Sequence, residues 1–143
     1  MEEILFFKEG EIEYPSFFSD SKIVKWLQVI ADHYEKKLGA INFIFSDDEY
    51  ILSVNQQYLN HDYYTDVITF DYCEDEWLSG DVFISLDTVL SNSEEYHVTY
   101  ENEFHRVICH SLLHLIGFKD KTEEDSMKMR ENENTCLDLL KGL

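Results

Sequence analysis

The segment from Glu101 to Ile116 most constrains how this chain folds, because it is typical of one long helix with two chemically different sides. At about 3.6 residues per turn, one side of that helix collects the apolar residues Phe104, Ile108, Leu112 and Leu115. The opposite side, within about 40° of His110, collects Glu103, Arg106, His114 and Gly117. We therefore expect the apolar side to pack on a sheet and the polar side to face a cleft.

The rest of the chain predicts short strands interleaved with helices, without internal repeats or a linker. Strands are expected at Ile4–Phe7, Ile41–Ser46, Val67–Tyr72 and Val82–Leu86, the last two forming a hairpin. Helices are expected from about Ser19 to Leu38, closed by Gly39, and over Asp47–Leu59, Glu101–Ile116 and Thr122–Leu140. The last helix is expected to be apolar through Met127, Leu137 and Leu140. This pattern favours an α+β fold in which residues 1–143 form one domain: a mixed, mostly four-stranded sheet packed with about four to five helices.

Cysteine usage and hydropathy indicate a protein of the cytoplasm. The three cysteines, Cys73, Cys109 and Cys136, are widely spaced and form no CxxC pair, which suits free thiols in a reducing compartment. No stretch reaches the roughly 18 apolar residues that a membrane span needs. The acidic N-terminal segment carries no site typical of signal-peptide cleavage. We expect no membrane partner.

The charge balance argues against a nucleic-acid partner. The formal net charge is −19, and binding to phosphates depends on lysine and arginine contacts. Composition alone therefore favours another kind of partner. A local exception lies around the histidine pair, where the basic residues are Arg106, Lys119, Lys121, Lys128 and Arg130.

The run His110-Ser-Leu-Leu-His114-Leu-Ile-Gly117-Phe-Lys-Asp120 predicts a metal site on the long helix and the loop after it. Two histidines four residues apart lie on one face of a helix, so their imidazoles can converge on one ion. Gly117 can end the helix in a left-handed conformation and turn the chain back. Asp120 can then supply a third ligand, with Glu123 or Glu124 as alternatives. Three protein ligands leave one position open for water, as in catalytic zinc sites.

One residue type is missing from this run. Metalloproteases of the HExxH type place a glutamate directly after the first histidine, where it serves as the general base. Here that position is Ser111. A bound metal can still polarise a phosphodiester and lower the pKa of a bound water, but the site lacks the built-in base that peptide hydrolysis normally recruits.

Three motifs resemble those of the YbeY family of bacterial endoribonucleases and rRNA maturation factors. The histidine run is similar to the family's HGxLHLxGYDH signature. Residues 54–70 resemble its LNxxYRxKDxPTDVLSF segment without a gap, and residues 80–85 resemble its GDIxIS strand. Glu103 falls where the family usually has a glutamate, and Met127 and Glu131 resemble its downstream helix.

The resemblance implies a mixed sheet flanked by helices and one divalent metal ion, Zn²⁺, held by His110, His114 and Asp120. It implies metal-dependent cleavage of single-stranded RNA in ribosomal RNA maturation and small-subunit quality control, with metal-bound water as the nucleophile. The partners would be single-stranded rRNA and the small ribosomal subunit, and a protein partner could supply RNA affinity. Glu103 and Arg106 are the candidate catalytic residues.

The chain departs from the family pattern at two places. Asp120 replaces the family's third histidine, with Lys119 before it in place of aspartate; a carboxylate is a competent zinc ligand. Leu59 replaces an arginine that could have contacted phosphate, and His61 stands where the family often has lysine. Arg106 or His61 are the candidates for the lost contact. Two other functions stay open: a non-catalytic ribosome assembly factor with a structural zinc, and a zincin-type peptidase.

The remaining polar residues near these motifs have structural interpretations beside the functional ones. Glu103 is either a partner of a ligand histidine or a surface charge. Asn55, Thr65 and Asp66 fit a helix-to-strand connection better than a cleft wall, and Asp81 fits a turn. The expected structural or surface residues are His33, His97, His105, which falls on the far side of its helix, and Cys109, a core thiol.

Overall fold

A four-stranded sheet forms the base of the fold in the computed structural model, which describes residues 2–59 and 65–143. Its strands are β1 (Glu3–Glu9), β2 (Lys37–Ser46), β3 (Val67–Asp71) and β4 (Trp77–Ser85), in the order β1-β2-β4-β3. Strands β1, β2 and β4 run parallel, and β3 pairs antiparallel with β4 at one edge. The predicted mixed sheet and the β3–β4 hairpin are confirmed.

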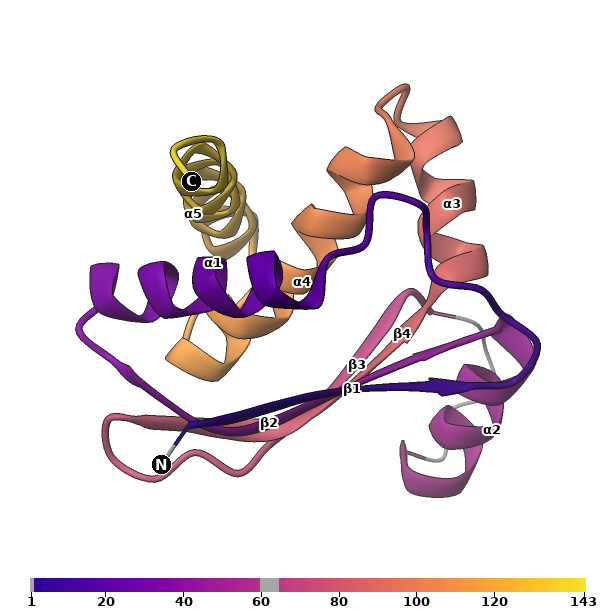
Figure 1. Cartoon of the computed structure of the whole chain (residues 1–143), viewed down its shortest axis with the longest axis horizontal. Coiled ribbons are helices and arrows are strands. Elements are labelled where there is room, and N and C mark those ends of the chain that lie inside the picture. The colour runs from indigo at the N-terminus through magenta and orange to yellow at the C-terminus, as the bar shows by residue number, and fades with distance from the viewer. Residues whose placement is uncertain (1, 60–64) are drawn as a thin grey trace.

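The described residues form five helices, and they cover the two faces of the sheet unequally. The helices are α1 (Asp20–His33), α2 (Asp48–Leu59), α3 (Leu86–Glu95), α4 (Tyr100–Ile116) and α5 (Glu123–Lys141). Helices α1, α3, α4 and α5 lie on one face, and α2 lies on the other (Figure 1). There, Ile51 and Val54 of α2 pack on Ile68 of β3.

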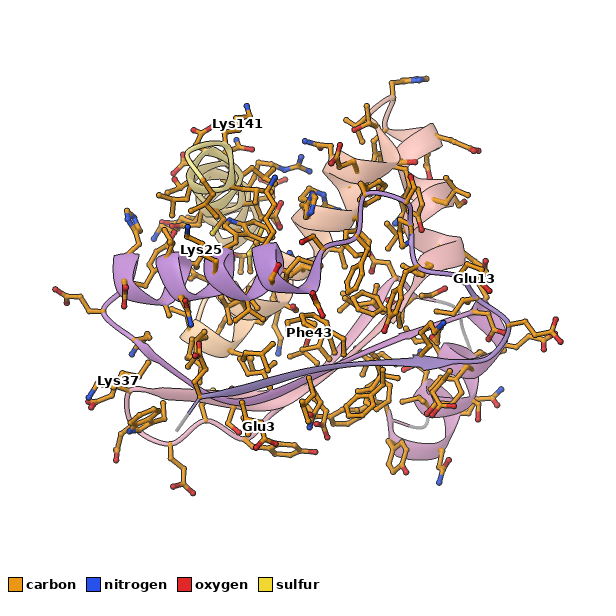
Figure 2. All side chains as sticks on the ribbon, viewed as in Figure 1. Glu3, Glu13, Lys25, Lys37, Phe43 and Lys141 are labelled. Carbon is orange, nitrogen blue, oxygen red and sulfur yellow. The ribbon has the colours of Figure 1, made fainter. Side chains whose placement is uncertain are left out.

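The main core lies between the sheet and α4, and it confirms the predicted apolar side of that helix. Phe104, Ile108 and Leu112 are at most 1% exposed and belong to the same cluster as Phe43 of β2. Figure 2 shows Phe43 between the sheet and the helices. Trp26 of α1 is fully buried, and its indole N–H donates to the Cys136 carbonyl of α5 at 2.7 Å. This bond joins α1 and α5 beside α4.

Gly80 lets α4 come close to strand β4. A Cβ atom at this position would lie 2.3 Å from the Phe70 carbonyl oxygen and 3.2 Å from a side-chain carbon of Leu115. The first distance is far inside van der Waals contact with backbone, so a larger residue would push the hairpin or the helix away. Glycine is thus required where the end of α4 that carries His114 lies over the sheet.

The end of the first helix differs from the prediction. Helix α1 ends at His33, and Glu35 takes a positive φ of 58° in the turn that follows. Gly39, expected to close this helix, lies inside β2, where a Cβ would meet the Leu78 carbonyl oxygen at 2.9 Å. The apolar residues at helical spacing stop at Tyr34, and the next apolar residue, Leu38, is buried in the core as part of β2 instead of extending the helix.

The second half of the chain required two further corrections. Leu86, expected in a strand, begins α3, a helix the prediction lacked; the Ser85 side chain caps it by accepting from the Thr88 N–H. Asp81, expected in a turn, lies within β4 and accepts from the Asn42 side-chain amide at 2.9 Å.

The buried side of α5 also differs from the prediction. Met127 is 66% exposed, whereas Leu137 and Leu140 are partly buried and pack against the core, as expected. The residues buried on this helix are Met129, Glu133 and Cys136. The buried side of α5 therefore includes a carboxylate, which must find a donor or a cation inside the protein.

No helix in the described part of the chain combines the length and the apolar character that crossing a bilayer requires.

Candidate metal centre

The end of α4 and the turn after it bring together the three predicted metal ligands. Gly117 follows the helix with a φ of 125°, and its N–H reaches back to the carbonyls of Leu113 and His114. Nothing lies within 4 Å of the Cβ position of Gly117, so the positive φ alone explains the glycine. This predicted helix end is confirmed. The reversed chain carries Asp120 back over the histidine face.

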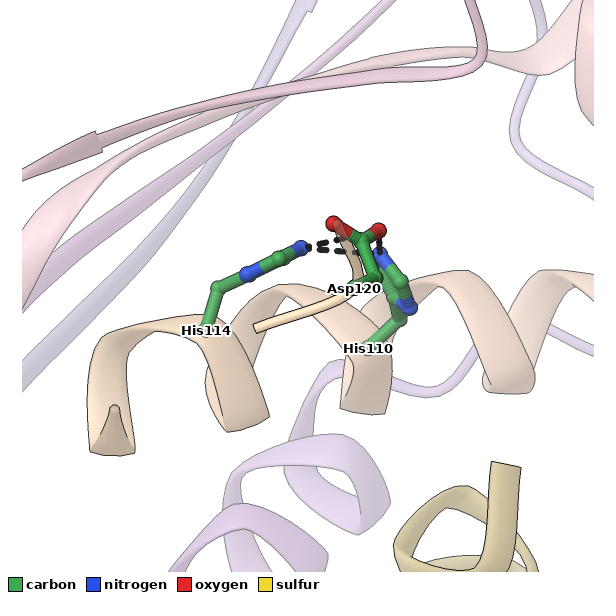
Figure 3. A group of neighbouring side chains, drawn as sticks. All are labelled: His110, His114 and Asp120. Atoms are coloured by element: carbon green, nitrogen blue, oxygen red, sulfur yellow. Dashed lines mark hydrogen bonds and ion pairs between the residues drawn. The ribbon is translucent and has the colours of Figure 1, made fainter. Parts of the chain in front are cut away.

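The ligand atoms of these residues converge on one point, as Figure 3 shows. The Nε2 atoms of His110 and His114 are 3.0 Å apart, and each lies 3.5 Å from Oδ2 of Asp120. The side chains are 17%, 31% and 44% exposed, in chain order. The site is therefore open toward Asp120 and closed behind His110. Among the described residues, His110, His114 and Asp120 form the group of histidine and carboxylate side chains that lie close enough together to hold a metal ion.

Both imidazoles are oriented through their other nitrogen. His110 Nδ1 lies 2.6 Å from Glu133 Oε2, and His114 Nδ1 lies 3.0 Å from the Phe118 carbonyl oxygen. A carboxylate and a carbonyl only accept hydrogen bonds, so both Nδ1 atoms donate. In the neutral rings, both Nε2 atoms then carry lone pairs, which are the ligand atoms a metal requires.

This arrangement fits a bound cation. Two nitrogen lone pairs facing each other at 3.0 Å repel unless a positive charge lies between them. Around a tetrahedral zinc with bonds of about 2.0–2.1 Å, two nitrogen ligands are about 3.3 Å apart, close to the observed separation. Two histidines and one carboxylate also form a donor set that zinc accepts.

Strand β3 supplies the opposite wall of a cavity of about 450 Å³ in front of the histidines. Alternation along the strand turns Val67, Thr69 and Asp71 toward α4, whereas Ile68 and Phe70 turn toward α2. The cavity is lined by Thr65, Asp66, Val67, Thr69, Asp71, His110, His114, Leu115 and Asp120. Thr65 and Asp66, for which a purely structural role was favoured, therefore line the cleft. The signal that could have placed Thr69 and Asp71 there was the two-residue period of the strand.

Glu103 and Arg106 lie behind His110 and do not line this cavity. Arg106 donates to both oxygens of Glu103, through Nε at 2.8 Å and Nη2 at 2.5 Å, and through Nη1 to Glu133 Oε1 at 3.1 Å. Glu103 is 1% exposed, so its interpretation as a surface charge is wrong. Within the described part of the chain its carboxylate bonds to Arg106 rather than to a histidine. A catalytic role for Glu103 and Arg106 stays a prediction.

Electrostatics favour the charged forms of Glu133 and Arg106. Burial raises the pKa of Glu133, but the hydrogen bond from His110 and the Arg106 charge outweigh it, so the pKa lies below its usual value. The hydrogen bonds to Glu103 keep the Arg106 pKa above normal despite burial. Burial raises the pKa of Asp66 across the cavity, although Arg106 and His110 lower it in part.

Other residues singled out in the sequence lie away from the ligands. Ser111 is fully buried and donates to the Ile108 carbonyl at 2.6 Å, and Cys109 is a fully buried thiol, as expected. His105 packs among aromatic rings on the far side of α4, as expected, with its ring centroid 5.6 Å from that of Trp26. Leu59 is 40% exposed at the end of α2, and His61 lies outside the described residues.

Sequence reasoning missed Glu133. The signal was its spacing: Glu133 lies four residues after Met129 and three before Cys136, at an apolar position of α5. A charged residue in such a buried stripe predicts an internal partner, but its identity required knowing which helix packs against α5.

Comparison with known proteins agrees with the motifs and the fold. The family model described as endoribonuclease YbeY matches residues 7–141. The chain is 54% identical over 115 residues to an endoribonuclease YbeY of Parabacteroides distasonis, covering 80% of this chain and 81% of that one. It is 43% identical over 141 residues to that of Cytophaga hutchinsonii, covering 98% of both. The solution structure of TM1509 from Thermotoga maritima covers 98% of this chain and 90% of its own, with a TM-score of 0.69 and 26% identity. The chain therefore belongs to the endoribonuclease YbeY family.

Proposed function

We propose that this protein is a metal-dependent endoribonuclease that cleaves single-stranded RNA in the maturation and quality control of the small ribosomal subunit, in the cytoplasm. Membership of the family supports the nuclease activity. One observation carries the metal dependence: two imidazoles whose Nδ1 atoms are both engaged direct their Nε2 atoms toward each other and toward Asp120. The ligand types favour zinc.

The residues around the proposed metal would have different roles. Bound zinc would supply a Lewis acid and lower the pKa of a water molecule. Glu133 and the Phe118 carbonyl hold the two imidazoles in place. Asp120 adds one negative charge beside them. The hydroxyl groups of Thr65 and Thr69 line the facing wall, where they could bind phosphate or ribose oxygens.

Charge distribution predicts weak binding of naked RNA. The cavity wall contains three aspartates, and none of its described lining residues is a lysine or arginine. Arg106, considered as a phosphate contact, already bonds to two buried glutamates. With a net charge of −19, the protein repels polyphosphates. The ribosomal particle or a protein partner would therefore supply most of the affinity.

The test is cleavage of a single-stranded RNA oligonucleotide by purified protein after chelation and after stoichiometric zinc is added back. We expect cleavage only with metal, weak binding, and a shallow salt dependence from few phosphate contacts. His110→Ala is the inactive control. Metal-independent cleavage, retained in that variant, would contradict the proposal.

A non-catalytic assembly factor with a structural metal is the second candidate, because no described cation lines the cavity. Repeating the cleavage assay with the small ribosomal subunit as substrate separates the two: a non-catalytic factor binds metal and gains thermal stability but leaves both the oligonucleotide and the RNA of the particle intact. A zincin-type peptidase has less support, since Ser111 points into the core and not toward the ligands. Chelator-sensitive digestion of casein would favour that activity.

A further inference from the structure

Glu133 connects the first metal ligand to a buried arginine. Its carboxylate is nearly fully buried, and each oxygen has its own hydrogen-bond partner. Oε2 lies 2.6 Å from His110 Nδ1, and Oε1 lies 3.1 Å from Arg106 Nη1. Arg130 Nε lies 3.9 Å from the same Oε1, beyond hydrogen-bond distance but adding positive charge on that side.

We propose that Glu133 is a positioning residue that fixes the Nδ1–H tautomer of His110 and thereby keeps Nε2 free to bind metal. This inference rests on the metal site proposed above. A neutral imidazole carries its proton on one nitrogen only, and the group facing the other nitrogen decides which. Because a carboxylate only accepts, it selects the proton on Nδ1.

Arg106 fixes the role of each Glu133 oxygen. A guanidinium only donates, so the atom that faces it must accept. Arg106 cannot easily turn away, since Glu103 binds its Nε and Nη2 from the other side. The atom on the Arg106 side of residue 133 is therefore always an acceptor.

This constraint makes an unusual prediction for the isosteric variant Glu133→Gln. The amide oxygen must face Arg106, which leaves the amide NH₂ facing His110 Nδ1. An NH₂ group donates, so Nδ1 becomes the acceptor and the proton moves to Nε2, the atom that must bind metal. If residue 133 only filled space, glutamine would change zinc binding little. A tautomer switch instead places a proton on His110 Nε2 and prevents that atom from binding metal.

The direct test is ¹⁵N NMR of the imidazoles in metal-free protein at about pH 8.5, above the ordinary imidazole pKa. His110 signals are identified by their loss in His110→Asn. We expect the Nδ1–H tautomer in the wild type and the Nε2–H tautomer in Glu133→Gln. The matched control is Glu131→Gln, which makes the same change on the exposed side of α5 and should leave the wild-type pattern.

The second readout is zinc affinity, measured by competition with a chromophoric chelator, together with the visible spectrum of the Co²⁺ form. We expect Glu133→Gln and Glu133→Ala to weaken zinc binding by about 10–100-fold, while Glu131→Gln does not. Melting of the metal-free variants shows whether they fold. An Nε2–H tautomer of His110 in the wild type overturns the inference without any variant. The inference is also overturned if Glu133→Gln folds and shows the same His110 tautomer and the same zinc affinity as the wild type.

The two proposals fail separately. If the wild type binds zinc and shows the expected tautomers but cleaves no RNA, the nuclease proposal fails and the role of Glu133 stands. If RNA cleavage requires zinc but Glu133→Gln is unchanged, the role of Glu133 fails and the nuclease proposal stands.

Discussion

His110 and His114 lie one turn apart on α4 and direct their Nε2 atoms to the same point, yet different parts of the molecule orient them. The Nδ1 of His114 bonds to the Phe118 carbonyl, four residues away. The Nδ1 of His110 bonds to Glu133, 23 residues away on another helix. One ligand is oriented by the local turn and the other by the packing of α5 on α4. The local motif therefore contains the group that orients His114 but not the group that orients His110.

The largest effect is expected when either histidine side chain is removed. His110→Ala and His114→Ala should each weaken zinc binding by at least about 100-fold, because two remaining protein ligands hold zinc poorly. Metal analysis after gel filtration and chelator competition measure this loss. His33→Ala, at an exposed position at the end of α1, is the control and should keep its metal. Full occupancy in either site variant would place the metal elsewhere.

Asp120 should show a large effect that a histidine reverses. Its carboxylate oxygen lies 3.5 Å from both Nε2 atoms, so Asp120→Ala should weaken zinc binding by about 10–100-fold. Asp120→His should retain zinc, since imidazole is also a zinc ligand. Chelator competition on both variants measures the difference. Unchanged affinity in Asp120→Ala would direct attention to Glu123 and Glu124.

The local side of the comparison can be perturbed through Gly117. Alanine at a φ of 125° costs about 1–3 kcal/mol, and relief of this strain would move the Phe118 carbonyl away from His114. We expect Gly117→Ala to weaken zinc binding by up to about tenfold and to lower the melting temperature. Gly142→Ala is the matched control, because Gly142 follows α5 with an ordinary φ of −80°. Equal behaviour of the two variants would show that the turn does not orient His114.

The smallest effect is expected at the third histidine of α4, which has no place in the site. Burial lowers the pKa of His105, offset in part by Glu101. The unfolded chain therefore takes up a proton at a higher pH than the folded chain. Stability from this residue is present above the unfolded value of about 6.5 and is lost as pH falls toward the lower folded pKa. His105→Phe should make the loss of melting temperature from pH 7.5 to 5.5 shallower; His33→Gln should not.

The candidate metal ligands could be predicted to converge because they form one local pattern. Their spacing depends only on helix geometry and on a glycine that ends the helix, so His110, His114 and Asp120 converge as expected. The strands of the sheet were predictable because each is a short apolar run, which is also a local pattern. Helix α3 was not, because only Leu86, Val89 and Ser93 of it are buried, too few for a clear apolar period.

The environment of the ligands depended on tertiary structure. Glu103 and Arg106 were recognised as residues on the histidine side of α4, but their mutual ion pair and its contact with Glu133 arise where α5 packs on α4. Asp66 and Asp71 reach the cavity only because the β3–β4 hairpin lies opposite α4. Residue spacing indicates which face of β3 Asp71 lies on and that Glu133 is buried, but it does not indicate which element packs against either residue.

The contact between Glu133 and His110 also has a consequence during protein synthesis. Glu133 follows Asp120 by 13 residues in the chain. At about 5–20 residues per second, the ribosome adds Glu133 on the order of a second after the last of the three ligands. For that interval a nascent chain carries His110, His114 and Asp120 without the carboxylate that bonds to His110. Under the role proposed for Glu133, both imidazoles are oriented to bind an ion only after α5 has docked on α4, and not as soon as the histidine motif has been made.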